Sequence, residues 1–334
     1  MKNLDALPQS RIHYAETGDS KPNAAWTLSR MAGGLLTALA VSVAGYGNAM
    51  AQTAGVINAI GVENEYADVI SQIGGQYVKV TAIETDPNTD PHSFEVSPKV
   101  ATEIAAADLI VKNGIGYDDW ADKIISAAPN AGRKVIDVQH LLGLPDSTPN
   151  PHLWYDPKTM PAVAEAVAAD LSALLPAQAG YFHENTKTFE ASLKPWTDAI
   201  ASFKADYPNT SVAVTEPVGD YMLAAAGTNI VTPFSLQAAI MNGTDPSPQD
   251  VTTQNGLFTG HRVKVFVYNQ QVTDPLTQSF LNLAKENGIP IVGVYETMPQ
   301  PGYDYQTWML AEVAALRKAM AGKTSTETLQ MGNQ

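Results

Sequence analysis

The chain has 334 residues, of which 45% are hydrophobic and only 16% are charged, so it is long enough for two domains with buried cores. Its formal net charge of −14 disfavours anionic membrane surfaces and nucleic acids as partners, and we expect it to bind no nucleic acid. Cysteine is absent from the sequence, which excludes disulfides, thiolate metal sites, cysteine nucleophiles and a lipid-attachment cysteine.

The first predicted element is a secretory signal peptide over residues 1–51, with an unusually long polar region at 1–29. The segment 31–47 is apolar and uncharged, and it is shorter than the ~20 residues that a membrane-spanning helix needs. Ala49-Met50-Ala51 fits a small-residue cleavage pattern, so we expect cleavage near Ala51. A soluble periplasmic protein fits this arrangement best.

Short apolar runs alternate with helical patterns over residues 52–177, which we assign to a first lobe. Strands are predicted over residues 56–62, 78–83, 109–111 and 135–138. Helices are predicted over residues 66–73, 97–108, 118–127 and 157–175. This alternation predicts the α/β class, with a parallel sheet flanked by helices.

A long helical stripe follows over residues 178–208. From Phe182 to Phe203, apolar side chains recur at alternating spacings of four and three residues. This stretch would form one helix about 33 Å long, with a kink at Pro195. A helix of that length between two α/β regions predicts a rigid linker.

The α/β pattern restarts over residues 209–322, which we assign to a second lobe. Strands are predicted over residues 211–215, 229–231, 263–268 and 290–295. Helices are predicted over residues 219–226, 275–286 and 305–320. We therefore expect two Rossmann-like lobes, each a mostly parallel sheet flanked by helices, joined by one long rigid linker helix. We expect residues 323–334 to be a disordered tail and the protein to be a monomer.

A proline-histidine pair occurs twice in similar polar loops, in Asp90–His92 and in Asn150–His152. Proline fixes its own φ and biases the preceding residue toward extended geometry, so each histidine is held in a defined direction. A single histidine in a loop is more often an ordinary residue than a ligand. Two matching loops in one exported chain favour a metal site that includes His92 and His152.

Two glutamates directly follow predicted strands of the second lobe, Glu216 and Glu296. Ligands of open α/β sheets bind beyond the carboxyl ends of the strands, so these glutamates and the two histidines converge if the lobes face each other. Either glutamate alone would more often be a solvated residue or a helix-capping partner. Two imidazoles and two carboxylates suit Zn²⁺, Mn²⁺ or Fe²⁺, which leaves the metal open. Nearby acids that could orient the imidazoles are Asp90, Asp156 and Asp220.

These motifs resemble the metal-specific substrate-binding proteins, of the cluster A-I type, that serve bacterial ABC importers for zinc, manganese or iron. The resemblance covers residues 52–322, and its motifs are DPH at 90–92, NPHLWYDP at 150–157, VTEPVGDYM at 214–222 and VYET at 294–297. It implies a metal bound between the lobes by His92, His152, Glu216 and Glu296. It also implies a long helix at 178–206 between the lobes, and delivery of the metal to an ABC permease driven by a cytoplasmic ATPase.

The chain departs from that family pattern at the third and fourth ligand positions. Many zinc members carry a histidine in place of Glu216 and a His- and Asp-rich loop before the second ligand. A glutamate at the third position resembles manganese or iron members instead. The fourth ligand is often aspartate, and Glu296 is one methylene longer. We therefore expect Zn²⁺ or Mn²⁺ as the transported ligand, with Fe²⁺ as an alternative.

Two other functions fit parts of the pattern. A secreted metallohydrolase could use the same His/Glu site, but catalytic zinc usually keeps an open coordination position, and the sequence has no H-E-x-x-H motif. A binding protein for an organic solute, or a surface adhesin, would hold no tightly bound metal. The sequence therefore predicts a periplasmic metal receptor without catalytic activity.

Overall fold

The computed structural model describes residues 55–299 and 301–329. The predicted signal peptide at residues 1–51 and the last residues of the predicted tail, 330–334, lie outside the described residues. Within the described ranges, no helix combines the length and the apolar character needed to cross a membrane.

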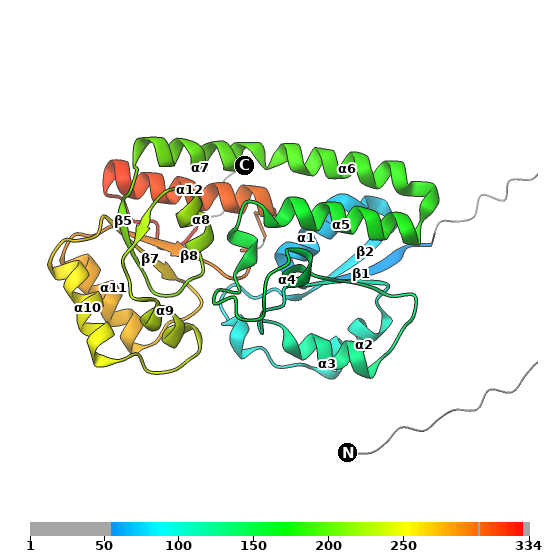
Figure 1. Ribbon diagram of the computed structural model, residues 1–334, viewed down its shortest axis with the longest axis horizontal. Helices are drawn as coiled ribbons and strands as arrows, with labels where there is room; N and C mark the ends of the chain where they lie inside the picture. Colours follow the sequence, from blue (N-terminus) through cyan, green and yellow to red (C-terminus); the bar gives the residue numbers. More distant parts are fainter. Residues whose placement is uncertain (1–54, 300, 330–334) are drawn as a thin grey trace, which may run out of the picture. The chain divides into compact units, whose positions relative to one another are not determined.

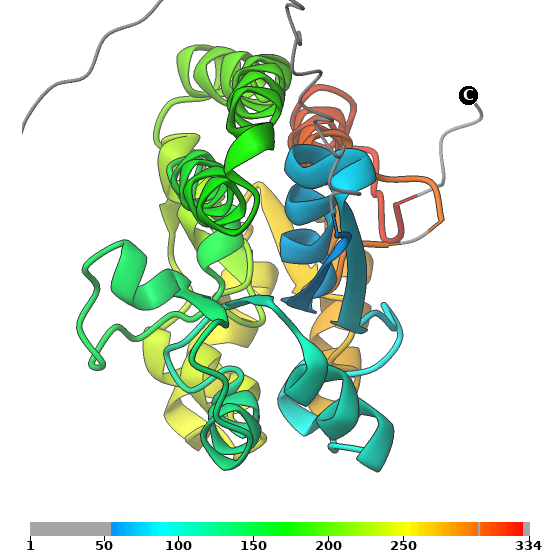
Figure 2. The same ribbon diagram turned by 90° about the vertical axis from the view of Figure 1, so that its right-hand side faces the viewer.

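The first lobe is a four-stranded parallel sheet in the order β2-β1-β3-β4 (Figure 1). Its strands are β1 (Ile57–Glu63), β2 (Val78–Glu84), β3 (Leu109–Lys112) and β4 (Lys134–Asp137). Its helices are α1 (Asn64–Gly74), α2 (Pro98–Ala106), α3 (Asp119–Ala127), α4 (Val138–Leu141) and α5 (Thr159–Leu174). Figure 2 shows this lobe end-on, with α1 beside the blue strands.

The second lobe repeats this strand order as β6-β5-β7-β8, again all parallel. Its strands are β5 (Ser211–Val214), β6 (Asn229–Ile230), β7 (Val265–Asn269) and β8 (Ile291–Val294). Its helices are α8 (Asp220–Ala225), α9 (Phe234–Met241), α10 (Pro248–Thr259), α11 (Pro275–Glu286) and α12 (Tyr305–Gly322). The prediction of two α/β lobes with parallel sheets is confirmed.

The linker between the lobes is two consecutive helices, α6 (Ala179–Ser192) and α7 (Lys194–Asp206), so the kink expected at Pro195 takes the form of a one-residue break in the helix. The break lies at Leu193, whose N–H donates to the carbonyl of Glu190 at 3.2 Å in a tighter turn. Its physical cause is Pro195, which has no N–H to continue the helical hydrogen bonding. In Figure 1 the two helices run along one side of both lobes, where α6 packs on α5 and α7 packs on α12.

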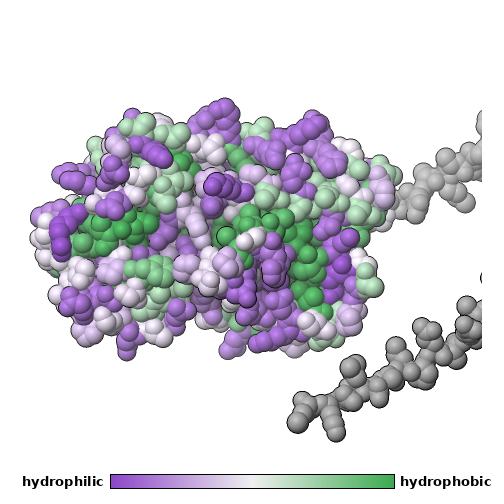
Figure 3. All heavy atoms as spheres, in the orientation of Figure 1, coloured by the Kyte–Doolittle hydropathy of each residue, from purple (hydrophilic) through white to green (hydrophobic). Residues whose placement is uncertain are grey.

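One hydrophobic core extends through both lobes and the linker helices. Trp196 of α7 is fully buried, and its ring lies edge-on to that of Tyr305 of α12 with 5.8 Å between centroids. Phe189 of α6 lies 6.5 Å from the same tyrosine ring. Figure 3 shows a mostly hydrophilic face with smaller apolar patches over both lobes. The two lobes therefore share one core cluster, and each lobe has a smaller cluster of its own.

Part of the predicted disordered tail pairs with the edge of the second sheet through one isolated bridge at Thr326, so the prediction of disorder is wrong there. The N–H of Thr326 donates to Ile291 at 2.8 Å, and its carbonyl accepts from Gly293 at 2.9 Å. Strand β8 is the last strand of its sheet, and its outer edge offers unpaired backbone groups. Thr326 satisfies two of them.

Candidate metal centre

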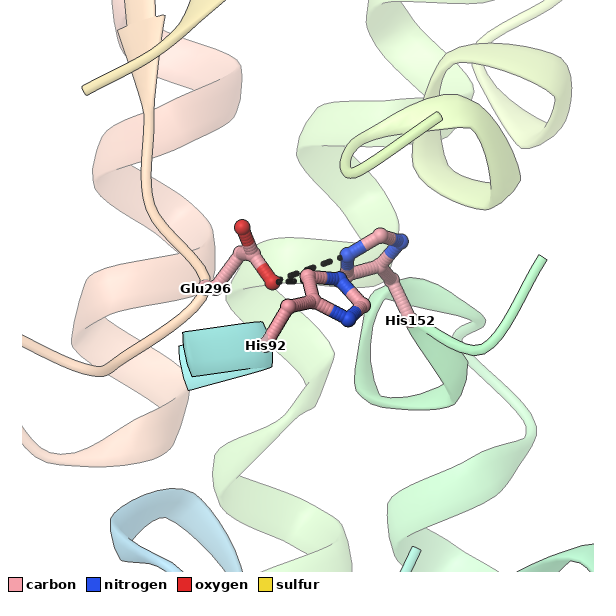
Figure 4. Close-up of side chains that lie close together, drawn as sticks. All are labelled: His92, His152 and Glu296. Atoms are coloured by element: carbon pink, nitrogen blue, oxygen red, sulfur yellow. Dashed lines mark hydrogen bonds and ion pairs between the residues drawn. The ribbon is translucent and has the colours of Figure 1, made fainter. Parts of the chain in front are cut away.

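Three of the four predicted ligand side chains converge between the lobes (Figure 4). Nε2 of His92 lies 3.3 Å from Oε2 of Glu296, and Nε2 of His152 lies 3.1 Å from the same oxygen. One ligand atom from each of the three residues lies within 4.8 Å of the others. The histidines come from loops of the first lobe, and Glu296 comes from the loop after β8. The site therefore exists only where the two lobes meet.

The loop that carries His92 is fixed by its own turn. Asp90 caps the 3₁₀ turn Pro91–Ser93, and its Oδ1 accepts the backbone N–H of His92 at 2.8 Å. The hydroxyl of Ser93 donates to the carbonyl of Asp90 at 2.7 Å. Asp90 was expected to orient the imidazole, but the hydrogen bond goes to the backbone of His92. It therefore positions the histidine through the main chain.

The loop that carries His152 uses Asn150 in the same way and adds a contact to the ring. Oδ1 of Asn150 accepts the N–H of His152 at 3.0 Å and lies 2.8 Å from its Nδ1. Because Asn150 Oδ1 is an acceptor, it favours the neutral tautomer with the proton on Nδ1, and in that tautomer the Nε2 lone pair is available to a metal ion. The side-chain amide of Asn150 also forms a contact between the lobes, because it donates to the carbonyl of Pro217 in the second lobe at 2.7 Å.

Sequence reasoning gave Asn150 no role, although it precedes His152 by two residues as Asp90 precedes His92. The two-residue spacing shared by these pairs was the sequence signal that could have identified Asn150 as a supporting residue. The other two acids proposed to orient the imidazoles behave differently. Asp156 accepts the N–H of Lys158, and Oδ1 of Asp220 has no hydrogen-bond partner among the described residues. Neither of them forms a described hydrogen bond to an imidazole.

Glu216, the fourth predicted ligand, lies beside the converged group rather than within it. Asn269, the last residue of β7, donates to Oε1 of Glu216 at 3.2 Å and to Oε1 of Glu296 at 2.6 Å. Glu216 is only 2% exposed, and within the described ranges its Oε2 has no hydrogen-bond partner. Burial, and then the charge of Glu296, raise the pKa of Glu216 well above its usual range. A cation next to Oε2 of Glu216 would offset the cost of burying this oxygen without a partner.

The ionisation of Glu296 is set by the two histidines. Burial alone would raise its pKa, but hydrogen bonds with His152 and His92 hold the pKa well below its usual range. Burial would lower the pKa of His92, yet the contacts with Glu296 raise it above its ordinary value. For His152, burial prevails and lowers the pKa. The hydroxyl of Tyr117 also donates to Oε2 of Glu296 at 2.9 Å. The carboxylate is therefore held as the anion that a metal requires.

Gln271 connects the loops that carry His92 and Glu296. Its Oε1 accepts the N–H groups of Glu296 at 2.6 Å and Thr297 at 2.9 Å. Its Nε2 donates to the carbonyl of Thr89 at 2.7 Å and to the hydroxyl of Thr297 at 3.1 Å. The side-chain amide thus uses both of its donors and both lone pairs of its acceptor. Asn269 and Gln271 were missed, although they stand at the carboxyl end of β7, where the rule that selected Glu216 and Glu296 also applies.

Other hydrogen bonds join the lobes close to the site. The amide of Asn64 at the start of α1 pairs with the backbone of Met298, donating to its carbonyl and accepting its N–H, both at 2.9 Å. The hydroxyl of Tyr155 donates to the carbonyl of Tyr295 at 2.8 Å. The residues on both sides of Glu296 are therefore attached to the first lobe.

Comparisons with known proteins bear on the same regions of the chain. A family model described as ZnuA, zinc-uptake complex component A, periplasmic, matches residues 63–319. A putative metal-binding protein of Chlamydia trachomatis is 24% identical over 205 residues, which are 59% of this chain and 70% of that protein. The manganese-binding lipoprotein MntA of Bacillus subtilis is 26% identical over 137 residues, which are 39% of this chain and 44% of that protein.

Solved structures support the fold. The periplasmic zinc-binding protein TroA of Treponema pallidum superposes with a TM-score of 0.68 at 17% identity, covering 81% of this chain and all of that one. A crystal structure of ZnuA gives a TM-score of 0.65 at 20% identity, covering 80% of this chain and all of that one. At this identity the likeness establishes the two-lobed architecture.

Proposed function

Because the chain belongs to the family of the periplasmic zinc-uptake complex component A, we propose that it captures a divalent transition metal ion between its lobes and delivers it to an ABC permease. The observation that carries this proposal is the convergence of His92, His152 and Glu296 from both lobes. Neither lobe carries all three side chains, so an ion bound by them would link the two lobes. The ion is the cargo of the protein and no catalytic step is needed.

We propose that His92, His152, Glu216 and Glu296 are the ligands. The three converged side chains offer two imidazole nitrogens and one carboxylate. The buried oxygen of Glu216 that has no described partner supports its role as the fourth ligand. An unpaired buried carboxylate is costly, and coordination to a cation offsets that cost.

We propose Zn²⁺ or Mn²⁺ as the transported ion, with Fe²⁺ as the alternative. Imidazole suits zinc and iron, whereas carboxylates suit manganese, so this mixed set excludes none of them. The names of relatives include a zinc-binding protein, a manganese-binding lipoprotein and an iron-binding protein of Yersinia pestis. Elemental analysis and competitive titration of the purified protein with Zn²⁺ and Mn²⁺ would decide the preference.

The same titration tests the site through three single variants. His92→Ala and His152→Ala should each abolish tight metal binding while the circular dichroism spectrum stays that of the native fold. His140→Ala is the matched control, because this histidine is exposed and pairs with Asp137 away from the centre. Normal binding by both His92→Ala and His152→Ala would place the metal elsewhere and overturn the proposal.

We also propose that the protein has no catalytic activity, works as a monomer in the periplasm and loses a signal peptide near Ala51. The family match gives no support to the alternative of a secreted metallohydrolase. Metal-dependent hydrolysis of esters or peptides by the pure protein would contradict this proposal. N-terminal sequencing of the exported protein would locate the cleavage site, and light scattering would give its mass in solution.

A further inference from the structure

The side-chain amide of Asn269 bridges the two glutamates of the candidate centre. Asn269 is the last residue of β7 and is only 1% exposed. Its Nδ2 donates to Oε1 of Glu296 at 2.6 Å and to Oε1 of Glu216 at 3.2 Å. A side-chain amide nitrogen carries two hydrogens. Both hydrogens are therefore used by the two carboxylates, one for each.

The orientation of this amide is fixed by its other contacts. Oδ1 of Asn269 accepts the backbone N–H of Gln271 at 3.0 Å. A backbone N–H only donates, so the atom that faces it is the amide oxygen, and the nitrogen faces the glutamates. The backbone N–H of Asn269 donates to the hydroxyl of Thr215, the residue before Glu216, at 3.0 Å. Contacts on both sides of Asn269 thus hold its amide in one orientation.

Glu296 presents only one of its two oxygens to the histidines. Its Oε2 lies 3.1 Å from Nε2 of His152 and 3.3 Å from Nε2 of His92, and it accepts the hydroxyl of Tyr117 at 2.9 Å. In Figure 4 the other oxygen, Oε1, points away from both imidazoles. Turning the carboxylate so that both oxygens face the histidines would break the hydrogen bond from Asn269. Hydrogen bonds to a charged group are among the stronger ones in proteins, so this orientation with one inward oxygen is stabilised.

Glu216 also has one oxygen that is bonded to Asn269 and one that is not. Its Oε1 accepts from Asn269, whereas Oε2 is buried and has no hydrogen-bond partner among the described residues. Each carboxylate therefore keeps one oxygen that Asn269 leaves available to a metal ion. With Nε2 of His92 and Nε2 of His152, these oxygens make a set of four donor atoms, two nitrogens and two oxygens.

We infer that Asn269 is a specificity-determining residue, which restricts Glu216 and Glu296 to one metal-binding oxygen each and so favours Zn²⁺ over Mn²⁺. This inference rests on the proposed transport function and its ligands. Four nitrogen and oxygen donors are the number that zinc takes in closed protein sites. Manganese suits an octahedral, oxygen-rich set, which these residues provide only when both carboxylates bind through both oxygens. Asn269 contacts the ligands and not the ion, so it is a positioning residue.

The change in metal preference tests this role, because sites of nitrogen and oxygen ligands generally bind zinc more tightly than manganese. Asn269→Leu removes the donor at similar volume. It should lower the ratio of the Mn²⁺ to the Zn²⁺ dissociation constant about 10-fold or more, as expected for a residue that supports metal ligands. An unchanged ratio in this variant would overturn the inference.

Asn64→Leu is the matched control for this titration. Asn64 is a similarly buried amide that joins the lobes through the backbone of Met298, and it forms no described hydrogen bond to a proposed ligand. Its ratio of dissociation constants should equal that of the wild type. An equal fall of the ratio in both variants would show that any loosening of the lobes changes the preference, and it would also overturn the inference.

Cobalt provides a test that does not require the variants to fold. Co²⁺ absorbs visible light far more strongly in a four-coordinate site than in a six-coordinate one, so its spectrum reports the number of ligands. We expect the intense absorption from the unmodified protein and a weaker one from Asn269→Leu. A weak, six-coordinate spectrum of the unmodified protein would overturn the inference even when metal binds tightly. Absence of tight Zn²⁺ and Mn²⁺ binding would instead overturn the transport proposal, so the two failures are distinguishable.

Discussion

The side-chain carbonyl of Gln271 accepts the backbone N–H of Glu296 at 2.6 Å. The same amide donates to the carbonyl of Thr89, three residues before His92. One side chain of the second lobe therefore holds the loops that carry two proposed ligands from opposite lobes.

Replacing Gln271 with leucine should accelerate metal release. The change leaves the buried N–H groups of Glu296 and Thr297 without an acceptor and frees the loop at Thr89, which should cost about 2–4 kcal/mol of stability. We expect release to be 10–100 times faster, as for other supporting residues around metals. Stopped-flow transfer to a chelator would measure the rate, with the exposed Gln278→Leu of α11 as control. Equal rates would show that Gln271 does not hold the site.

Replacing Asn150 with alanine should weaken metal affinity about 10–100-fold. Without its carbonyl, Nδ1 of His152 loses its acceptor, and the ring no longer presents the Nε2 lone pair in a fixed direction. Asn150→Asp keeps an acceptor at this position and should recover part of the affinity. Competitive titration against a chelator would compare the three proteins. Wild-type affinity in Asn150→Ala would contradict the orienting role.

Replacing Glu216 with histidine should shift metal preference toward zinc. The change converts a set of two imidazoles and two carboxylates into one of three imidazoles, and carboxylates favour manganese more than imidazoles do. The measurement is the ratio of Zn²⁺ to Mn²⁺ dissociation constants. An unchanged ratio, with both affinities intact, would mean that Glu216 is not a ligand.

Metal affinity should fall as the pH is lowered. Contacts with Glu296 raise the pKa of His92 above its ordinary value, so protons compete for this ligand from a higher pH than for a free histidine, near 6.5. Binding should release protons, and its affinity should decline steadily between pH 8 and pH 5 (a range spanning that value). Isothermal titration in buffers of different ionisation enthalpy would count the protons. A flat profile would contradict the assignment of the histidines.

Glu312 should make the protein less stable as the pH rises. Burial raises its pKa to about 8, although Trp308 and Tyr155 donate hydrogen bonds to it. Between the unfolded value near 4.3 and about 8, the folded protein retains a proton that the unfolded chain has lost, so stability decreases with pH. Glu312→Gln removes this dependence and should gain up to about 5 kcal/mol over the wild type by pH 9. Parallel urea denaturation series at several pH values would reveal the difference, and identical slopes would refute it.

The sequence predicted the parts of the fold that depend on local patterns. Alternating apolar runs located the eight strands of the described residues, and the Pro-His loops and Glu296 after a strand located the three side chains that converge at the site. Helix α10 was missed although Ser247 and Pro248 begin it as Ser97 and Pro98 begin α2, because few of its residues are buried and they form no clear apolar stripe. A capping residue that is not followed by an amphipathic pattern of apolar residues is a weak signal for a helix.

The supporting contacts of the site could not be predicted from such patterns. Thr89 and Gln271 are 182 positions apart, and their hydrogen bond exists only because the two lobes meet there. The pairing of Thr326 with β8 likewise depends on an unoccupied sheet edge, which becomes visible only when the order of the strands is known. The position of Glu216 beside the converged group could not be predicted either, because it depends on the contact with Asn269, which also donates to Glu296.

The common apolar core limits how the bound ion could leave. Swinging the lobes apart would pull Tyr305 of α12 away from buried Trp154 of the first lobe, whose carbonyl accepts the Tyr305 hydroxyl at 2.6 Å, and would open the shared core, whereas opening the loops near His92 and Glu296 breaks a few hydrogen bonds. The less costly motion prevails in a native protein. Amide hydrogens around Glu296 should therefore exchange with deuterium well before those of β3 and β7. The time for which the metal ion stays bound is then set by how often these loops open, while the rest of the protein keeps its structure.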